Sequence, residues 1–538
     1  MKTFPAQQGK TPASRLPDPT PLLLASGLSS QEVARILQAY GIHDWKQADM
    51  NLQTMAGEPA SRKTLATILP EVLASVARTA DPDQALNEWE RYADSGIHRL
   101  QLYQYLAVVP HVIEVLGAAF GNSPAMAQTF IRDPLLVYWI EDDRVLVRRT
   151  TRNVLLTNLE ALLSAVTSFD ARCEALRRFK RREMLRIGIR DLLGVATPVE
   201  TYTMLSELAS AVIHAVYELV DQDLRQRFGD FRGAPSNRGT SDGFSVLAMG
   251  KLGGWELNYS SDVDLIYVYH ASQGNTKAGK GQTSISRTLY CETLARELTA
   301  VLTASTAEGA LFRVDLRLRP EGMVGPLASS LEDALHYYNG RGRTWERLAF
   351  LKAKPIAGNI RVGQSLIRGL ASFVYGNEEV ADEVFPAIQS LRSQILSKMI
   401  RRGEVDRHVK LGVGGIREIE FIVQGLQLRW GYRYPKIRDR QTLKGLVKLR
   451  QIGKLTAQEA SMLKESYVFL RNLEHKLQMV NEFQTHLLPT KSEEISKCAV
   501  RMGYLKGTSI EEATQTFLDD FRRHTSVVHR LYEHIIGS

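Results

Sequence analysis

Two aspartates separated by one residue, Asp262 and Asp264, follow a glycine-containing segment that begins at Gly250. An apolar run from Phe244 to Met249 precedes the glycines and a second run, Leu265 to Tyr269, follows the aspartates, and both runs predict strands. In an extended segment, residues two apart share a face, so the two carboxylates would lie together. Such a pair repels unless a cation lies between its members, which favours a divalent metal ion. The glycines would let the backbone approach a phosphate.

A third carboxylate, Asp315, lies in a segment where apolar residues alternate with Asp315, Arg317 and Arg319. The alternation predicts a strand with these three charged side chains on one face. Guanidinium groups bind phosphate oxygens with two parallel hydrogen bonds. If this strand pairs with the Asp264 strand, three carboxylates could hold two metal ions, roughly 3.5–4 Å apart, for an in-line displacement at phosphorus. The alternative is a solvated edge strand with salt bridges, and the first motif favours the metal site.

The spacing of these residues resembles the polymerase-β-like nucleotidyltransferase superfamily, although that superfamily usually has Gly or Ser at the position of Lys251. The longer string Gly-Lys-Leu-Gly-Gly-x-Glu-Leu-Asn-x-x-Ser-Asp-x-Asp-Leu-Ile resembles glutamine synthetase adenylyltransferase, the bifunctional adenylylating and deadenylylating enzyme of bacterial nitrogen control. The resemblance runs from about residue 95 to the C-terminus. Four further segments carry it: residues 176–186, 314–320, 343–347 and 414–424.

The resemblance implies one of two opposite activities. The family carries two nucleotidyltransferase units in tandem, of which the N-terminal one removes AMP from a tyrosine of glutamine synthetase and the C-terminal one adds it. This chain holds one acidic-pair motif, and its Glu-Leu-Asn and Gly-Gly-Ile-Arg-Glu-Ile-Glu strings resemble the N-terminal unit. The expected reaction is phosphorolysis, giving ADP and unmodified glutamine synthetase. The sequence leaves open whether the chain is a cut half or a natural single-unit form.

Three other functions remain as alternatives. The first is the forward adenylyltransferase, which moves AMP from ATP to the tyrosine. The second is a catalytically silent regulatory module, against which the intact Asp262, Asp264 and Asp315 argue. The third is a nucleic-acid polymerase or end-modifier of the same superfamily. A P-loop is absent from the sequence, and residues 250–254 lack the Gly-x-Gly-x-x-Gly spacing of a dinucleotide site.

The resemblance also assigns residue roles. Asp262 and Asp264 are expected to bind both metal ions and Asp315 to complete the catalytic one, with Mg²⁺ as the ion and Mn²⁺ equally acceptable to oxygen ligands. Lys251 is expected to contact nucleotide or phosphate, with a role as a surface amine as the alternative. Ser261 is expected to do the same, with a role as a turn hydroxyl as the alternative. The expected partners are glutamine synthetase, the PII signal protein, ATP or ADP, and inorganic phosphate. The expected nucleotide and phosphate contacts are Gly250, Lys251, Gly253, Ser261, Arg317 and Arg319.

The elements around these residues predict an α+β fold that is mostly helical, with a small mixed β-sheet as the nucleotidyltransferase core. Turn residues 236–243 would open that core. Helices are expected at 30–40, 86–106, 198–228 (behind Thr197 as cap), 284–303, 386–402, 416–430 and 463–480. The chain would comprise a disordered tail (1–21), a helical N-terminal region (22–235), the catalytic core with following helices (236–385) and a C-terminal helical bundle (386–538).

Several polar groups on these helices have two interpretations each. Arg343, Trp345 and Arg347 could be core residues or nucleotide contacts, with a purely structural role favoured. Free N–H groups at Gly414 and Gly415, at a helix start, could bind a phosphate. Solvated faces are favoured over sites for the stripe Arg417, Glu420, Gln424, Gln427, for the stripe Arg471, Glu474, Gln478, and for the basic helix 177–186.

Bulk composition fits a folded protein of two to four domains: 538 residues, 44% hydrophobic and 24% charged. The net charge of +9 could attract nucleotide, phosphate or an acidic protein, but no DNA- or RNA-binding signature accompanies it, so no nucleic-acid partner is expected. Cys173, Cys291 and Cys498 have neither disulfide nor metal-site spacing. No signal peptide and no apolar run of about 18 residues is evident, so we expect a cytoplasmic protein without a membrane span.

Overall fold

The computed structural model describes residues 16–230, 243–270, 273–480, 484–505 and 507–537. Its contacts divide the chain into two compact units. Unit 1 comprises residues 1–149, 182–201 and 471–523, and unit 2 comprises residues 150–181, 202–470 and 524–538. The chain therefore passes between the units several times, which differs from the four consecutive parts predicted from the sequence. The reason is that contacts, and not sequence order, define a compact unit.

Unit 1 is helical. Its core holds tightly packed aromatic side chains, such as Trp89 against Phe120 at a centroid distance of 5.3 Å. The helices with all their residues in unit 1 are α1 (Pro21–Leu24), α2 (Ser30–Ala39), α3 (Trp45–Ala56), α4 (Pro59–Val76), α5 (Pro82–Ala93), α6 (Arg99–Val108), α7 (His111–Phe120), α8 (Pro124–Arg132), α9 (Leu136–Ile140), α10 (Asp143–Val147) and α24 (Ser492–Arg501).

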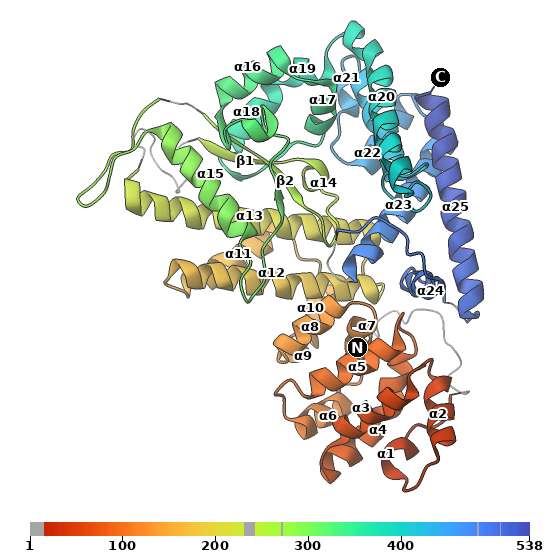
Figure 1. Ribbon diagram of the computed structural model, residues 1–538. Coiled ribbons are helices and arrows are strands. Elements are labelled where there is room, and N and C mark those ends of the chain that lie inside the picture. The colour runs from red at the N-terminus through yellow and green to blue at the C-terminus, as the bar shows by residue number, and fades with distance from the viewer. Residues whose placement is uncertain (1–15, 231–242, 271–272, 481–483, 506, 538) are drawn as a thin grey trace. The chain divides into compact units, whose positions relative to one another are not determined.

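Unit 2 contains the sheet and most of the remaining helices, and the predicted α+β, mostly helical class is confirmed (Figure 1). Its helices are α11 (Arg152–Ser164), α14 (Gly250–Gly253), α15 (Arg287–Thr303), α16 (Leu331–Arg341), α17 (Thr344–Phe350), α18 (Ile360–Gly369), α19 (Ala371–Tyr375), α20 (Glu378–Arg402), α21 (Ile416–Gly431) and α22 (Thr442–Gln451). Short 3-10 turns lie at Gly322–Val324 and Pro435–Ile437. Four long helices have residues in both units: α12 (Phe169–Leu192), α13 (Pro198–Phe228), α23 (Ala457–Met479) and α25 (Ile510–Ile535).

The sheet of unit 2 is mixed, as predicted. Its strands are β1 (Phe244–Ala248), β2 (Val263–Tyr269), β3 (Val314–Asp315), β4 (Ala328–Ser330) and β5 (Lys354–Gly358). The order is β3-β2-β1-β5, with β4 also paired to β2. Strand β1 is antiparallel to β2 and β5, whereas β3 and β4 are parallel to β2. All five residues of β1 are buried, which explains why its sequence is apolar apart from Ser245.

Helices cover both faces of this sheet. On one face Tyr217 of α13 stacks on Phe244 of β1 at 6.0 Å, and the Tyr267 hydroxyl of β2 lies 2.9 Å from Thr299 of α15. On the other face Gly363 of α18 packs so closely on β1 and β5 that a Cβ there would lie 2.7 Å from the Ser245 hydroxyl. The sheet is therefore the centre of a three-layer core that holds β2 and its aspartates in place.

Most predicted elements are present, with boundary changes that have local causes. Helix α13 begins and ends as predicted, and Thr197 caps it: the Glu200 N–H donates to the Thr197 hydroxyl at 3.3 Å. The helix predicted over 86–106 is instead two helices, α5 and α6, because Gly96 adopts a φ of 89° between them. Helix α20 begins at Glu378, well before the predicted start at Pro386.

The strand predicted around Asp315 is much shorter than expected. Only Val314 and Asp315 pair with β2, and the chain then turns. The Asp315 carboxylate accepts the backbone N–H of Arg317 at 2.9 Å, a local bond that starts a turn in place of further pairing. The predicted common face of Asp315, Arg317 and Arg319 is therefore wrong, because it required an extended backbone through all three residues.

Parts of two predicted segments lie outside the described residues. The turn predicted over 236–243 lies outside them, except for Gly243. Residues 1–15 of the predicted disordered tail also lie outside them. From Leu16 onward the chain is described, and the Tyr40 hydroxyl donates to the Pro17 carbonyl at 2.7 Å. The last part of that predicted tail is therefore packed within unit 1.

Most side chains of the three polar segments predicted to be solvated are buried, although the side chains of Arg178 and Arg417 are 52% and 33% exposed. Glu420, Gln424 and Gln427 on α21 are at most 7% exposed. In the basic helix, Arg177 and Arg186 are at most 4% exposed, and they pair with acidic residues three positions away. Helical periodicity identified these faces correctly, but several of their side chains meet polar partners inside the protein, such as Glu420 with Lys352 and Arg186 with Glu183. On α23 the three residues of the predicted polar stripe are all 0% exposed: Arg471, Glu474 and Gln478.

Helix α13 is long and apolar enough to cross a membrane by length and composition, contrary to the prediction that no segment would be. Helices α6 and α7 would also pass together, but they are bent by 117° at their junction. In the structure 78% of the apolar window of α13 is buried inside the protein, as in the core helix of a folded domain. The three cysteines are buried and free.

Candidate active site

The site is organised by the parallel pairing of β2 with β3. Asp264 lies directly opposite Asp315, and Val263 opposite Val314. Asp262 precedes β2 by one residue, on the same face as Asp264. Burial, followed by the negative charges of Asp315 and Asp262, raises the pKa of Asp264 to about 6 against the opposing effect of nearby lysines. The structure thus brings the three predicted carboxylates together.

Gly250, the first residue of α14, lies against the Asp264 side chain. Its φ is 53°, and a Cβ at this position would lie 2.3 Å from Oδ2 of Asp264. The preceding Met249 N–H donates to the Asp264 carbonyl at 2.9 Å. Only glycine allows this backbone conformation and this approach at low cost. The glycine therefore fixes the position of the carboxylate.

Gly253 has a packing role. A Cβ there would lie 2.0 Å from the Lys352 carbonyl and 2.5 Å from the Ala248 carbonyl. This glycine allows two backbone segments to approach each other, and its contacts point to the interior. Ser261 accepts the Asn258 N–H at 3.3 Å, which is the turn role left open by the sequence.

Arginines neutralise two of the three aspartates. Arg313 Nε lies 2.7 Å from Oδ1 of Asp262, and the same guanidinium donates to the Ser260 carbonyl at 2.7 Å. Arg317 Nε lies 2.8 Å from Oδ2 of Asp315. Burial alone would raise the pKa of Asp315, but its hydrogen bonds from Arg317 lower it more. Arg313 continues the alternation two residues before Asp315 but was not singled out, because its partner Asp262 is distant in sequence and strand pairing brings the two together.

Arg319, predicted to contact phosphate, has a structural role instead. It is 5% exposed and donates to the carbonyls of Leu316 at 3.0 Å, Met323 at 3.1 Å and Gly325 at 3.2 Å. All three carbonyls belong to the loop that follows β3. The prediction is wrong because the turn after Asp315 rotates Arg319 away from the carboxylates and into this loop.

A lysine that the sequence did not single out, Lys410, contributes to the site. Its charge, together with that of Lys251, opposes the rise in the Asp264 pKa. The Lys410 carbonyl accepts the Arg417 N–H at 2.9 Å, which ties this residue to the start of α21. Lys410 lies far beyond Asp264 in the sequence, and no local pattern links the two.

The start of α21 is not a phosphate site as the sequence suggested. The Gly414 N–H donates to Glu418 Oε2 at 3.0 Å, and the Gly415 N–H donates to the Gly412 carbonyl at 3.1 Å. These donors are already satisfied inside the protein.

Two arginines before and within α17 fit the structural role favoured above. The Arg343 N–H donates to the Glu346 carboxylate at 2.7 Å, which caps the start of α17. The Arg347 guanidinium lies 4.6 Å from the Phe373 ring centroid. The Arg343 backbone N–H therefore serves the start of this helix, and the Arg347 side chain serves its packing.

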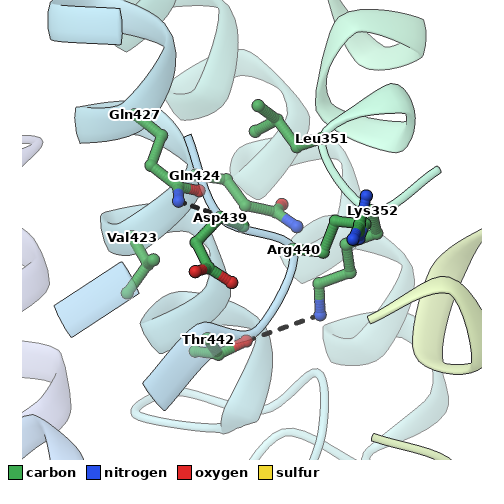
Figure 2. A pocket seen from close by; sticks show the side chains of 8 residues that line it. All are labelled: Leu351, Lys352, Val423, Gln424, Gln427, Asp439, Arg440 and Thr442. Atoms are coloured by element: carbon green, nitrogen blue, oxygen red, sulfur yellow. Dashed lines mark hydrogen bonds between the residues drawn. The ribbon is translucent and has the colours of Figure 1, made fainter. Parts of the chain in front are cut away.

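As the side chains stand, no three His, Cys, Asp or Glu residues of the described chain are arranged to hold a metal ion. At the candidate site, Asp262 and Asp315 are paired with Arg313 and Arg317. A small pocket of unit 2 lies between α21 and the segment before α22 (Figure 2). Its lining residues are Leu351, Lys352, Val423, Gln424, Gln427, Asp439, Arg440 and Thr442.

Two family models match the chain. Residues 113–368 match glutamate-ammonia ligase adenylyltransferase, and residues 389–536 match the GlnD PII-uridylyltransferase. The first match covers the three aspartates and the sheet. The second covers most of the helices from α20 onward.

Curated relatives agree with the first model, and each is named bifunctional glutamine synthetase adenylyltransferase/adenylyl-removing enzyme. The Nitrosococcus oceani protein is 38% identical over 413 residues, which are 76% of this chain and 41% of the relative. The Hahella chejuensis protein is 37% identical over 418 residues, 77% of this chain and 42% of the relative. The Streptomyces avermitilis protein is 31% identical over 520 residues, 95% of this chain and 47% of the relative. The chain spans less than half the length of these relatives.

Proposed function

Because this chain belongs to the glutamate-ammonia ligase adenylyltransferase family, we propose that it transfers AMP at a tyrosine of glutamine synthetase. The family assignment confirms the resemblance noted in the sequence. The observation that carries the proposal is the parallel pairing that places Asp264 opposite Asp315, with Gly250 against the Asp264 carboxylate. That arrangement concentrates negative charge at the point where a phosphoryl group would be transferred.

The proposed direction is removal of AMP. Inorganic phosphate attacks the α-phosphorus of the tyrosyl-AMP ester, the bond to the tyrosine oxygen breaks, and that oxygen takes a proton as ADP leaves. Phosphate is already ionised near neutral pH, so positioning and charge neutralisation contribute more than a strong base. The single acidic-pair motif and the Glu-Leu-Asn string around Glu256 support this direction.

A divalent metal ion is part of the proposal. Asp262, Asp264 and Asp315 would hold Mg²⁺ or Mn²⁺, since hard cations prefer carboxylate oxygens. Burial, followed by the negative charges of Asp315 and Asp262, raises the pKa of Asp264, and a cation at this position would offset that effect. The ion would supply charge neutralisation at the phosphoryl group. Arg317, whose side chain is 73% exposed, could then turn from Asp315 towards phosphate oxygens. The charge of Lys251 beside Asp264 would support phosphate binding, together with that of the lysine before α21.

The forward reaction, AMP transfer from ATP to the tyrosine, is the second candidate, because the relatives are named for both activities. It would use the same carboxylates. A catalytically silent module is the third candidate. The match of residues 389–536 to the GlnD PII-uridylyltransferase supports the PII signal protein as a regulatory partner. A cytoplasmic location would suit these partners.

The test is ADP release from adenylylated glutamine synthetase in the presence of phosphate and Mg²⁺. We expect phosphate-dependent ADP from the wild type and none from Asp262→Asn/Asp264→Asn. Asp382→Asn is the matched control, because this carboxylate is 69% exposed on α20 and pairs only loosely with Arg429, at 3.4 Å. AMP incorporation from ATP into unmodified glutamine synthetase, without ADP release, would establish the forward direction instead. The absence of both activities would support the silent module.

A further inference from the structure

A buried lysine, Lys352, lies between two carboxylates of unit 2. Its Nζ is 3.1 Å from Oε2 of Glu256 and 3.0 Å from Oε1 of Glu420, and the three side chains are 5–8% exposed. The Thr442 N–H donates to Oε1 of Glu256 at 2.6 Å, and the Tyr467 hydroxyl donates to Oε2 at 3.1 Å. Glu256 is therefore held from several directions in a fixed orientation.

The two carboxylates come from parts of the chain with different roles. Glu256 directly follows the segment from Gly250 to Trp255, which we call the active-site turn. Glu420 lies in α21, the helix that Lys410 precedes. Burial alone would lower the pKa of Lys352, but the carboxylates of Glu256 and Glu420 raise it well above its usual value. The lysine is thus a permanent cation that joins the turn to α21.

The active-site turn is built directly on Lys352. A Cβ at Gly253 would lie 2.0 Å from the Lys352 carbonyl, and one at Gly254 would lie 3.3 Å from its Cδ. The Glu256 N–H donates to the Lys251 carbonyl at 2.8 Å, which closes the turn. Since the first glycine of the turn touches the Asp264 carboxylate, a shift at Lys352 would reach that carboxylate through a few residues of rigid backbone.

Backbone strain in the turn also requires an anchor. Trp255 adopts a φ of 60°, a left-handed conformation that is unfavourable for a non-glycine residue. Such strain persists only where surrounding contacts hold it. Trp255 immediately precedes Glu256, whose carboxylate accepts several hydrogen bonds. Figure 2 shows the hydrogen bond between the Lys352 ammonium and the Thr442 hydroxyl, whose atoms are 3.5 Å apart.

We propose that Lys352 is a positioning residue for the transfer reaction: by holding Glu256 to Glu420, its ammonium fixes the active-site turn against Asp264. The reaction that it serves is the one in the proposed function. Stability alone does not require this cluster, because replacing a buried ion pair by well-packed neutral groups is often neutral or stabilising. The lysine instead sets where the turn lies.

The test uses the variant Lys352→Met/Glu256→Gln/Glu420→Gln, which removes all three charges and keeps the side-chain volumes. Hydrogen–deuterium exchange followed by mass spectrometry would report on the peptide 249–257, and ADP release would report kcat and KM. We expect exchange at 253–256 to rise by about tenfold or more. We expect kcat to fall by about 100-fold, with little change in KM and in melting temperature, because misplacing a catalytic group by about 1 Å costs this much.

Two further variants keep the proposal testable if the triple variant does not fold. Tyr467→Phe removes one hydrogen bond to Glu256 at constant shape, and we expect faster exchange in 249–257 and a fall in kcat of about fivefold. Asp221→Asn is the control, because this buried carboxylate pairs with Arg225 at 2.7 Å away from the turn. It should leave the exchange of 249–257 unchanged.

The proposal would be overturned if the folded triple variant kept the wild-type exchange of 249–257 and the full kcat. If the triple variant does not fold, the same result in Tyr467→Phe would overturn it. Equal loosening of the turn by Asp221→Asn would also overturn it, since the effect would then be general. The exchange measurement needs no substrate, so it tests Lys352 separately from the proposed function. If the wild type releases no ADP, the proposed function fails while the exchange result still decides whether Lys352 holds the turn.

Discussion

Replacing Gly250 by alanine tests the contact on which the candidate site depends. The new Cβ would lie 2.3 Å from Oδ2 of Asp264, about 1 Å less than an ordinary van der Waals contact. The φ of 53° adds roughly 1–2 kcal/mol of backbone strain for a non-glycine residue. The carboxylate must move by about 1 Å to relieve the contact, and a shift of this size lowers the rate by about 100-fold.

The assay combines phosphate-dependent ADP release with urea unfolding. Gly453→Ala is the matched control: its φ is 70°, it also lies in unit 2, and nothing lies within 4 Å of its Cβ position. Both variants should lose roughly 1–2 kcal/mol of stability because of their left-handed backbone conformation. Only Gly250→Ala should also show a lower rate of ADP release. Equal rates in the two variants would refute the argument that Gly250 fixes the position of Asp264.

Three further predictions follow from particular contacts. Arg319→Ala should lower the melting temperature, since it removes hydrogen bonds to three loop carbonyls. Arg317→Ala should lower the rate of ADP release at an unchanged melting temperature. The reverse pattern would contradict these assignments. Burial lowers the pKa of His475 to about 4. The unfolded imidazole takes its proton near pH 6.5, so the folded chain should lose stability as the pH falls from 6.5 towards 4, by about 2 kcal/mol between pH 7 and pH 5. Urea titrations at these two pH values should show a smaller loss for His475→Gln, and equal losses would contradict the assignment. Chelation by EDTA should stop ADP release and Mg²⁺ or Mn²⁺ should restore it, whereas activity that persists in EDTA would argue against the metal proposal.

Local patterns predicted much of the catalytic core. The apolar runs before and after the glycines are β1 and β2, because each run is long enough to fill one buried strand. The start of α13 followed from Thr197 and Pro198, whose capping preferences act over a few residues. The string around Asp262 and Asp264 was specific enough to identify the family.

The same patterns failed where the partner of a residue was distant in sequence. The polar face of α21 was predicted to meet water, yet Glu420 binds Lys352 and Gln427 donates to the Ile437 carbonyl. Periodicity shows which residues share a face of a helix, but it carries no information about what that face contacts. The prediction for Arg319 failed for a different, local reason, because a bond from the Arg317 N–H to the preceding aspartate ended the strand.

The sequence by itself determined the chemical groups of the site: three carboxylates, the glycines beside them and the strands that carry two of the acids. The tertiary structure decided which cations meet those acids and what holds them in register. Arg313 and Lys410 reach the aspartates, and Lys352 reaches Glu256 beside the active-site turn, only because strand pairing and helix packing bring distant segments together. Spacing along a chain fixes local geometry, whereas the distance between charges far apart in sequence is set by the packing of the whole core.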